Sequence, residues 1–179
     1  MKCRFIFLVL FIVLVFPIGS IAKKDGRYTE MEWETLMPPD WNPAEDFADL
    51  NLDELDDDDP RAEEAMKKLR KMWDEAPMNP GLQGKTVSIS GFVAPLDFTD
   101  RAELKEFLLV PYFGACIHLP PPPANQIIHV TLEKPRRGIR TMDDVTVYGK
   151  LAIETHESEM GRSGYSMKAD AIEPYVEKR

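Results

Sequence analysis

Two segments of the chain alternate between apolar and polar residues, and each carries a glycine among its apolar positions. Gly91 lies in the segment 85–94, and Gly149 lies in the segment 144–153. A period of two is typical of a half-buried strand, whose successive side chains point to opposite faces. A glycine on the inward face allows a strand to bend sharply or to approach another backbone closely. The matched glycines therefore predict a small, sharply coiled barrel.

Further strands are expected at 107–113, 126–132 and 165–175, with a short helix at 100–106. Five strands with one or two helices favour a mainly β, OB-like fold over a sandwich. In this fold, named for oligonucleotide and oligosaccharide binding, five strands form a small, partly closed barrel. We expect the barrel domain to occupy residues 81–179.

The chain ahead of the barrel divides into an acidic extension and a helix. Asp59 as N-cap and Pro60 at the first helical position precede a run of apolar residues at helical spacing, which predicts a helix over 61–77. Residues 23–60 are polar and acidic without a sustained period, and we interpret them as an N-terminal extension. The aspartate run at 56–59 is best explained as a solvated approach to the helix, because a calcium loop would need different spacing and a closing glutamate.

The first 22 residues predict export. Lys2 and Arg4 precede an apolar run at 5–16, and a small-residue site ends at Ala22, which is the pattern of a cleaved signal peptide. The run is shorter than the roughly 20 apolar residues of a spanning helix, so we expect a periplasmic protein without a membrane span after cleavage. The formal net charge of -9 offers no basic surface for phosphates, which argues against a nucleic-acid partner.

The residues around Cys116 suggest metal chemistry. Cleavage removes Cys3 and leaves Cys116 as the only cysteine, so an internal disulfide is excluded. In an extended backbone Cys116 and His118 point to the same side, and the prolines at 120–123 hold that backbone extended. His129 lies on the polar face of the next strand and joins them if that strand returns beside Cys116. Thiolate and imidazole are ligands of zinc and copper, so we expect a transition-metal site with these three ligands.

A fourth ligand could be water, Asp97, Glu106 or a partner's side chain. Each of the three ligands also has a structural interpretation: the cysteine as a small buried hydrophobe, the first histidine as a hydrogen-bonded loop residue, and the second as a solvated strand position. His156 lies among glutamates in an expected loop, and we interpret it as solvated.

Two sequence blocks carry a resemblance to a known family. They read GFVAPLD at 91–97 and LLVPYFGACIHLPPPPANQ at 108–126. With them the chain closely resembles the exported bacterial family catalogued as domain of unknown function 3299, most strongly over 84–132. The resemblance implies an OB-like domain, often encoded beside lipoprotein-release-type ABC transporter components and sometimes in settings of zinc homeostasis. It implies no catalytic activity.

The leading hypothesis is a periplasmic, non-enzymatic module that binds zinc or copper through Cys116, His118 and His129 and works with an ABC-type transport system. An alternative from the same block is a metal-free adaptor that docks a partner protein through the rigid proline loop. Its docking residues would be Tyr112, Phe113, Pro120, Pro121, Pro122, Pro123, Asn125 and Gln126. A histidine-activated Cys116 nucleophile is a third hypothesis, which is weaker because no orienting residue or oxyanion-hole motif is recognisable.

Overall fold

The computed structural model describes residues 26–42, 59–115 and 121–177. The expected signal peptide, most of the acidic extension, and the site residues Cys116, His118 and Pro120 lie outside the described residues. Within the described ranges, no helix is long and apolar enough to cross a membrane.

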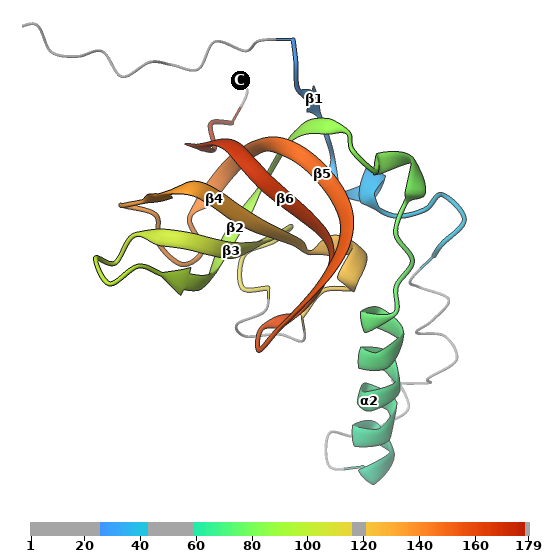
Figure 1. Cartoon of the computed structure of the whole chain (residues 1–179). Coiled ribbons are helices and arrows are strands. Elements are labelled where there is room, and N and C mark those ends of the chain that lie inside the picture. The colour runs from blue at the N-terminus through green and yellow to red at the C-terminus, as the bar shows by residue number, and fades with distance from the viewer. Residues whose placement is uncertain (1–25, 43–58, 116–120, 178–179) are drawn as a thin grey trace, which may run out of the picture.

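Five strands close into a barrel (Figure 1). They are β2 (Thr86–Phe98), β3 (Leu104–Val110), β4 (Ile128–Arg136), β5 (Asp144–Ser158) and β6 (Gly161–Pro174). The order is β2-β3-β4-β6-β5, and pairing of β5 with β2 completes the circle. Neighbouring barrel strands are antiparallel except β4 and β6, which run parallel. This confirms the mainly β, OB-like prediction, with a closed barrel instead of a partly closed one.

Strand β2 holds the barrel together because it pairs with two different strands along its length. Its residues from Thr86 to Phe92 pair with β5, and its residues from Phe92 to Phe98 pair with β3. The two-residue strand β1 (Thr29–Glu30) adds to the first part of β2 in parallel. A strand shared in this way must coil strongly, since its two halves face different neighbours.

The glycines predicted to permit this coiling lie at very close backbone approaches. A Cβ added at Gly91 would lie 2.6 Å from the carbonyl oxygen of Val110, and one added at Gly149 would lie 2.6 Å from that of Lys168. Real Cβ atoms do not approach carbonyl oxygens so closely, so only glycine fits without moving a backbone. The expectation of close approach is therefore confirmed at both positions.

Every barrel strand contributes apolar side chains to one main core. Tyr165 of β6 is fully buried there. Its hydroxyl donates to the carbonyl of Leu36, at 2.7 Å, and accepts from the backbone N–H of Asn79, at 2.6 Å. This one side chain therefore fastens the short helices η1 (Trp33–Leu36) and η3 (Pro80–Leu82) to the barrel.

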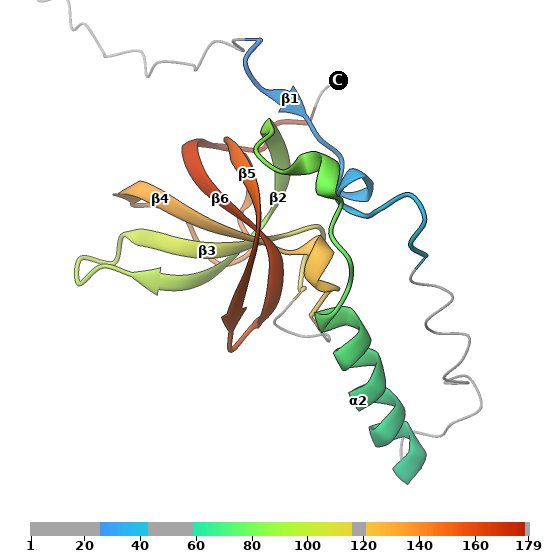
Figure 2. The ribbon, with the colours of Figure 1, turned by 45° about the vertical axis from the view of Figure 1, so that its right-hand side comes forward.

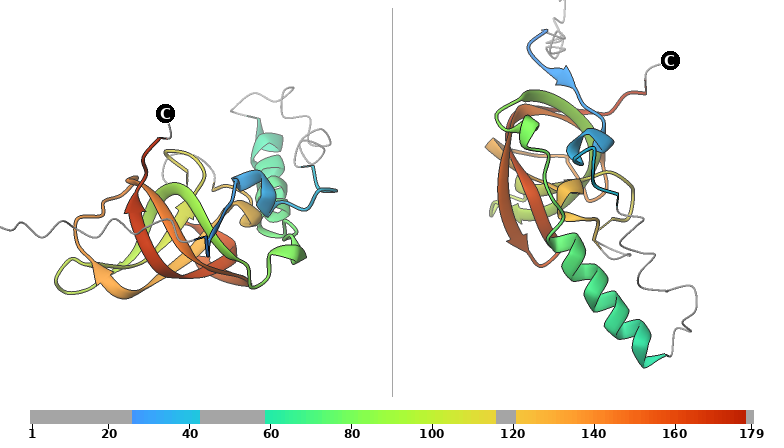
Figure 3. Two further views of the ribbon diagram at one scale, coloured as in Figure 1. Left: turned by 90° about the horizontal axis from the view of Figure 1, so that it is seen from above. Right: turned by 90° about the vertical axis from the view of Figure 1, so that its right-hand side faces the viewer.

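The helix α2 spans Pro60–Asp74, with the Asp59 side chain accepting from the backbone N–H of Arg61 as N-cap. It ends three residues before the expected limit of the helix. In Figures 2 and 3 the helix projects away from the barrel, while the strands wrap around a common centre.

The prediction of a helix at 100–106 is wrong. Leu104 and Glu106 belong to β3, and residues 99–103 form a tight turn closed by the backbone N–H of Thr99 on the carbonyl of Glu103. Burial of Leu104 in the core outweighs the helical propensity of its polar neighbours. The strand expected to reach Phe113 ends at Val110.

We predict that Gly149→Ala destabilises the barrel by about 1 to 3 kcal/mol, the usual cost of overpacking. The added methyl group would press on the Lys168 carbonyl and on Met167. Urea unfolding measures the loss. Gly26→Ala is the matched control, because an added Cβ there meets nothing within 4 Å, and an equal loss in both variants would contradict the close-approach argument.

We also predict that Tyr165→Phe costs about 1 to 3 kcal/mol, since it leaves two backbone groups without the hydroxyl. Burial raises the pKa of the Tyr165 phenol above its ordinary value of 10.0. The folded chain then holds this proton more tightly than the unfolded chain, so stability falls as the pH rises above that value. Unfolding curves at alkaline pH should show a shallower decline for Tyr165→Phe; an unchanged slope would contradict the prediction.

Candidate metal site

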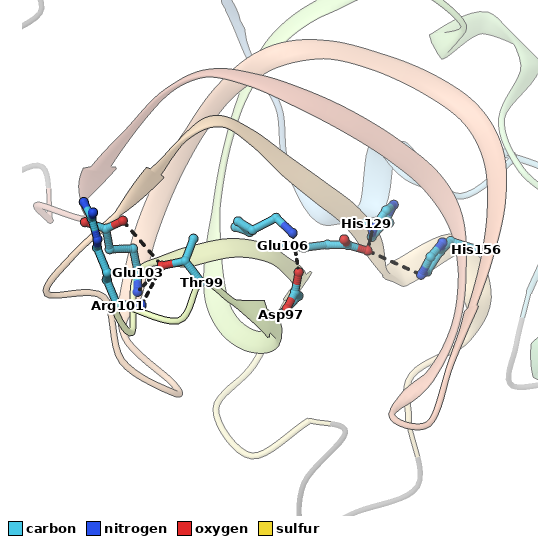
Figure 4. Close-up of polar contacts among 8 residues, drawn as sticks. Asp97, Thr99, Arg101, Glu103, Glu106, His129 and His156 are labelled. Atoms are coloured by element: carbon cyan, nitrogen blue, oxygen red, sulfur yellow. Dashed lines mark hydrogen bonds and ion pairs between the residues drawn. The ribbon is translucent and has the colours of Figure 1, made fainter.

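Three side chains from three strands meet on the outer surface of the barrel (Figure 4). They are Glu106 of β3, His129 of β4 and His156 of β5. Oε1 of Glu106 lies 2.5 Å from Nε2 of His129 and 3.7 Å from Nε2 of His156. One potential ligand atom from each residue lies within 4.8 Å of the other two.

Strand register brings these residues together. His129 follows the buried Ile128 and precedes the buried Val130, so its ring points outward. On the neighbouring strand β3, its cross-strand partner is Leu108, and Glu106 lies two residues away on the same face. The carboxylate can therefore reach the ring directly across the strand pair.

His156 reaches the other two across the intervening strand β6. The pairing of β5 with β6 shifts by one residue between Ile153 and His156, and such bulges redirect side chains. The positions of β6 that pair with the two histidines are both small: Ser163 opposite His156 and Ser166 opposite His129.

The imidazoles of His129 and His156 are stacked, with ring centroids 3.8 Å apart and planes inclined by 2°. The His129 side chain is 11% exposed, that of Glu106 28%, and that of His156 37%. Metal ions bind imidazole nitrogens in the ring plane at about 2.0 to 2.1 Å. One ion cannot lie in two parallel, stacked planes, so coordination by both rings requires one to turn. The more exposed His156 has the room to do so.

The cluster has a suitable donor set for a transition metal. Imidazole nitrogens suit zinc and copper, and a carboxylate oxygen is a common third ligand. The hydrogen bond from His129 Nε2 to Glu106 holds the ring in place. Three protein ligands would leave a coordination position open to a further ligand.

The structure changes the expected membership of the site. It brings Glu106, one of the suggested fourth ligands, directly to His129, whereas Asp97 is paired with Lys105 at 2.6 Å. The interpretation of His156 as a solvated loop residue is wrong, since it lies in β5 and stacks on His129. Its environment was not visible in the sequence because residues 154–157 show no apolar alternation that would extend the predicted strand.

The described residues on either side of positions 116–120 pack against β3 and β6. Ala115, the residue before Cys116, is fully buried in a second apolar cluster with Leu108, the cross-strand partner of His129. At the other end, Pro121 is buried against Gly161, where an added Cβ would lie 2.9 Å from the proline ring. Gly161 begins β6, which follows directly on the strand of His156.

The proposed docking residues divide into an exposed and a buried group. Tyr112 is 43% exposed and Phe113 68%, and Phe113 packs edge-on against Phe92. Asn125 is fully buried and donates to the carbonyl of Pro77, while the Gln126 amide donates to the carbonyl of Trp33. Pro121 and Pro122 are buried and Pro123 is half-buried. Among the described residues of this group, the two aromatic residues are therefore the most exposed.

Solved structures that are similar to this chain include the following two. A DUF3299 family protein from Pseudomonas aeruginosa PAO1, known from a crystal structure, is 30% identical. The match covers 85% of this chain and 99% of that chain, with a TM-score of 0.66. A small single-stranded DNA-binding protein from Streptomyces coelicolor is 16% identical over 52% of this chain and 95% of that chain, with a TM-score of only 0.32.

No curated protein matches the chain. The model of the family described as "Protein of unknown function (DUF3299)" matches residues 33–174. That span includes the whole barrel and all three residues of the candidate metal site. The chain thus belongs to the DUF3299 family.

Proposed function

We propose that this protein is a periplasmic, non-enzymatic module that binds zinc or copper on its barrel surface and works with an ABC-type transport system. The observation that carries the metal proposal is the convergence of Glu106, His129 and His156 from three strands. Ligands on strands of a closed barrel are held more rigidly than ligands on loops. In OB folds the second and third barrel strands form the usual binding face, and here those strands carry Glu106 and His129.

Cys116 and His118 are proposed as further ligands. The support is that their segment leaves from Ala115 and returns at Pro121, both packed near the strands of the cluster. A thiolate ligand would make the site selective for zinc or copper(I) over harder ions. The periplasmic location and the transport partner rest on the signal-peptide pattern and on the family resemblance.

Metal binding is tested on the mature chain, purified without chelator or histidine tag. We expect about one Zn²⁺ or Cu²⁺ per chain in competition titrations against a chromophoric chelator. His129→Ala and His156→Ala should each weaken binding by about tenfold or more, because each removes a ligand. Binding should also weaken on acidification, since protons compete for the imidazoles.

Glu106→Gln should also weaken metal binding, because it removes the carboxylate ligand, and Glu157→Gln is its matched control. It removes the same charge from a side chain that is 70% exposed and paired with Arg162. Cys116→Ser and His118→Ala then show whether the neighbouring segment contributes. Absence of metal uptake by the wild type, or unchanged affinity in the His129 and His156 variants, would refute the proposed site.

The cluster should also contribute to the free energy of unfolding when no metal is bound. This contribution is measured separately, in excess chelator. Glu106→Leu leaves His129 Nε2 without its acceptor and should cost about 1 to 3 kcal/mol, whereas Glu106→Gln keeps an acceptor and should cost less. Chemical denaturation distinguishes the two. Equal costs for both variants would mean that the hydrogen bond from His129 does not stabilise the fold.

The second candidate function is the protein-interaction adaptor, and the exposure of Tyr112 and Phe113 supports it. Aromatic residues are enriched at the centres of protein interfaces. A Phe113→Ser variant should then lose binding to a membrane-transport partner while keeping metal affinity. Loss of partner binding only in the metal-site variants would favour the metal module instead.

A further inference from the structure

A second concave surface lies on the first halves of β2 and β5, near β1 and the end of β6. We refer to it as the acidic groove. Its volume is about 360 Å³, within the range of small-ligand and peptide pockets. Its lining includes Glu30, Glu32, Trp33, Ser88, Phe92, Asp144, Tyr148, Glu173 and Tyr175. None of the residues of the metal cluster belongs to it.

The charge of the groove is of one sign. Glu30, Glu32, Asp144 and Glu173 all line it, and no lysine, arginine or histidine is among its lining residues. Burial raises the pKa of the Asp144 carboxyl above its ordinary value, and a ligand cation beside this carboxyl would offset that effect. A groove of this kind attracts a positively charged ligand, and the net charge of -9 for the whole chain strengthens that attraction at long range.

Four aromatic side chains are among the lining residues, and two of them are held in place by other contacts. The indole Nε1 of Trp33 donates to the carbonyl of Ser90 at 2.7 Å. The ring of Tyr148 meets Tyr28 edge-on, with centroids 5.3 Å apart. Rings fixed in this way can receive the ammonium or guanidinium group of a ligand on their faces by cation–π attraction, with little loss of side-chain entropy.

One polar group in the lining of the groove, the Ser88 hydroxyl, has no hydrogen-bond partner among the described residues. Ser88 is only 8% exposed, and its side chain makes no hydrogen bond to any part of the chain that the structure describes. Buried hydroxyl groups are normally paired. The Ser88 hydroxyl is thus available to a group that enters the groove.

We propose that the acidic groove binds an extended segment of a partner protein that carries lysine or arginine side chains. The four carboxylates come from β1, from the residue before η1, from β5 and from β6. Because they come from four different elements, a segment with several basic side chains can reach more of them than a single cation can. Its backbone can pair with the Ser88 hydroxyl, and its side-chain stems can pack on the aromatic side chains.

The test uses fluorescence anisotropy of a labelled eight-residue peptide with alternating lysine and alanine, mixed with the mature chain at low and physiological salt. We expect saturable binding that weakens with salt. The double variant Asp144→Asn with Glu173→Gln should weaken binding by about tenfold or more. The control Glu63→Gln with Glu64→Gln removes the same charge from the exposed face of α2 and should change affinity less than about twofold.

Several results would overturn the proposal. Equal weakening in the groove and α2 variants would show a general charge effect without a site. Equal affinity for a peptide with glutamate in place of lysine would exclude charge recognition. Binding of spermine as tight as that of the peptide would make the groove a site for small polyamines instead. Thermal melts confirm that each variant is folded, and His129→Ala should leave peptide affinity unchanged.

Discussion

Closure of the barrel through β2 is the constraint on which the rest of the structure depends. One strand pairs with β5 along its first half and with β3 along its second. This coiling brings carbonyl oxygens of neighbouring strands so close to Gly91 and Gly149 that a side chain at either position would block the approach. Once the barrel closes, the positions of the outer faces of β3, β4 and β5 relative to one another are fixed. The candidate metal site depends on this closure, because its three residues come from those strands.

The barrel presents two polar surfaces with different chemistry. The cluster of Glu106, His129 and His156 combines two imidazoles with one carboxylate, a set that suits a single multivalent ion. The acidic groove combines carboxylates from four elements with aromatic side chains, a set that suits several monovalent cations. Together, the two proposals describe a module with a metal site on one surface of the barrel and a separate site for a basic segment on another.

Several features of the fold were predictable from local pattern. Period-two alternation located the first part of β2 and of β5, and Asp59 with Pro60 marked the start of α2. The prediction of a helix at 100–106 failed because Leu104 is buried in the core. This tertiary burial outweighs the local propensity of a short polar segment. His129 was identified as a candidate ligand from its place on the polar face of a strand. His156 was missed because its strand extends past the last apolar alternation.

The sequence by itself determined the mainly β class, the need for glycine at two points of the barrel, and the acidic character of the chain. It also indicated the family, through the block at 108–126. The tertiary structure alone decided which polar residues meet. Glu106 lies 23 residues from His129, and His156 a further 27, so no local pattern links them. Their contact depends on strand order, on register and on a bulge in β5, which are settled only when all five strands pair at once.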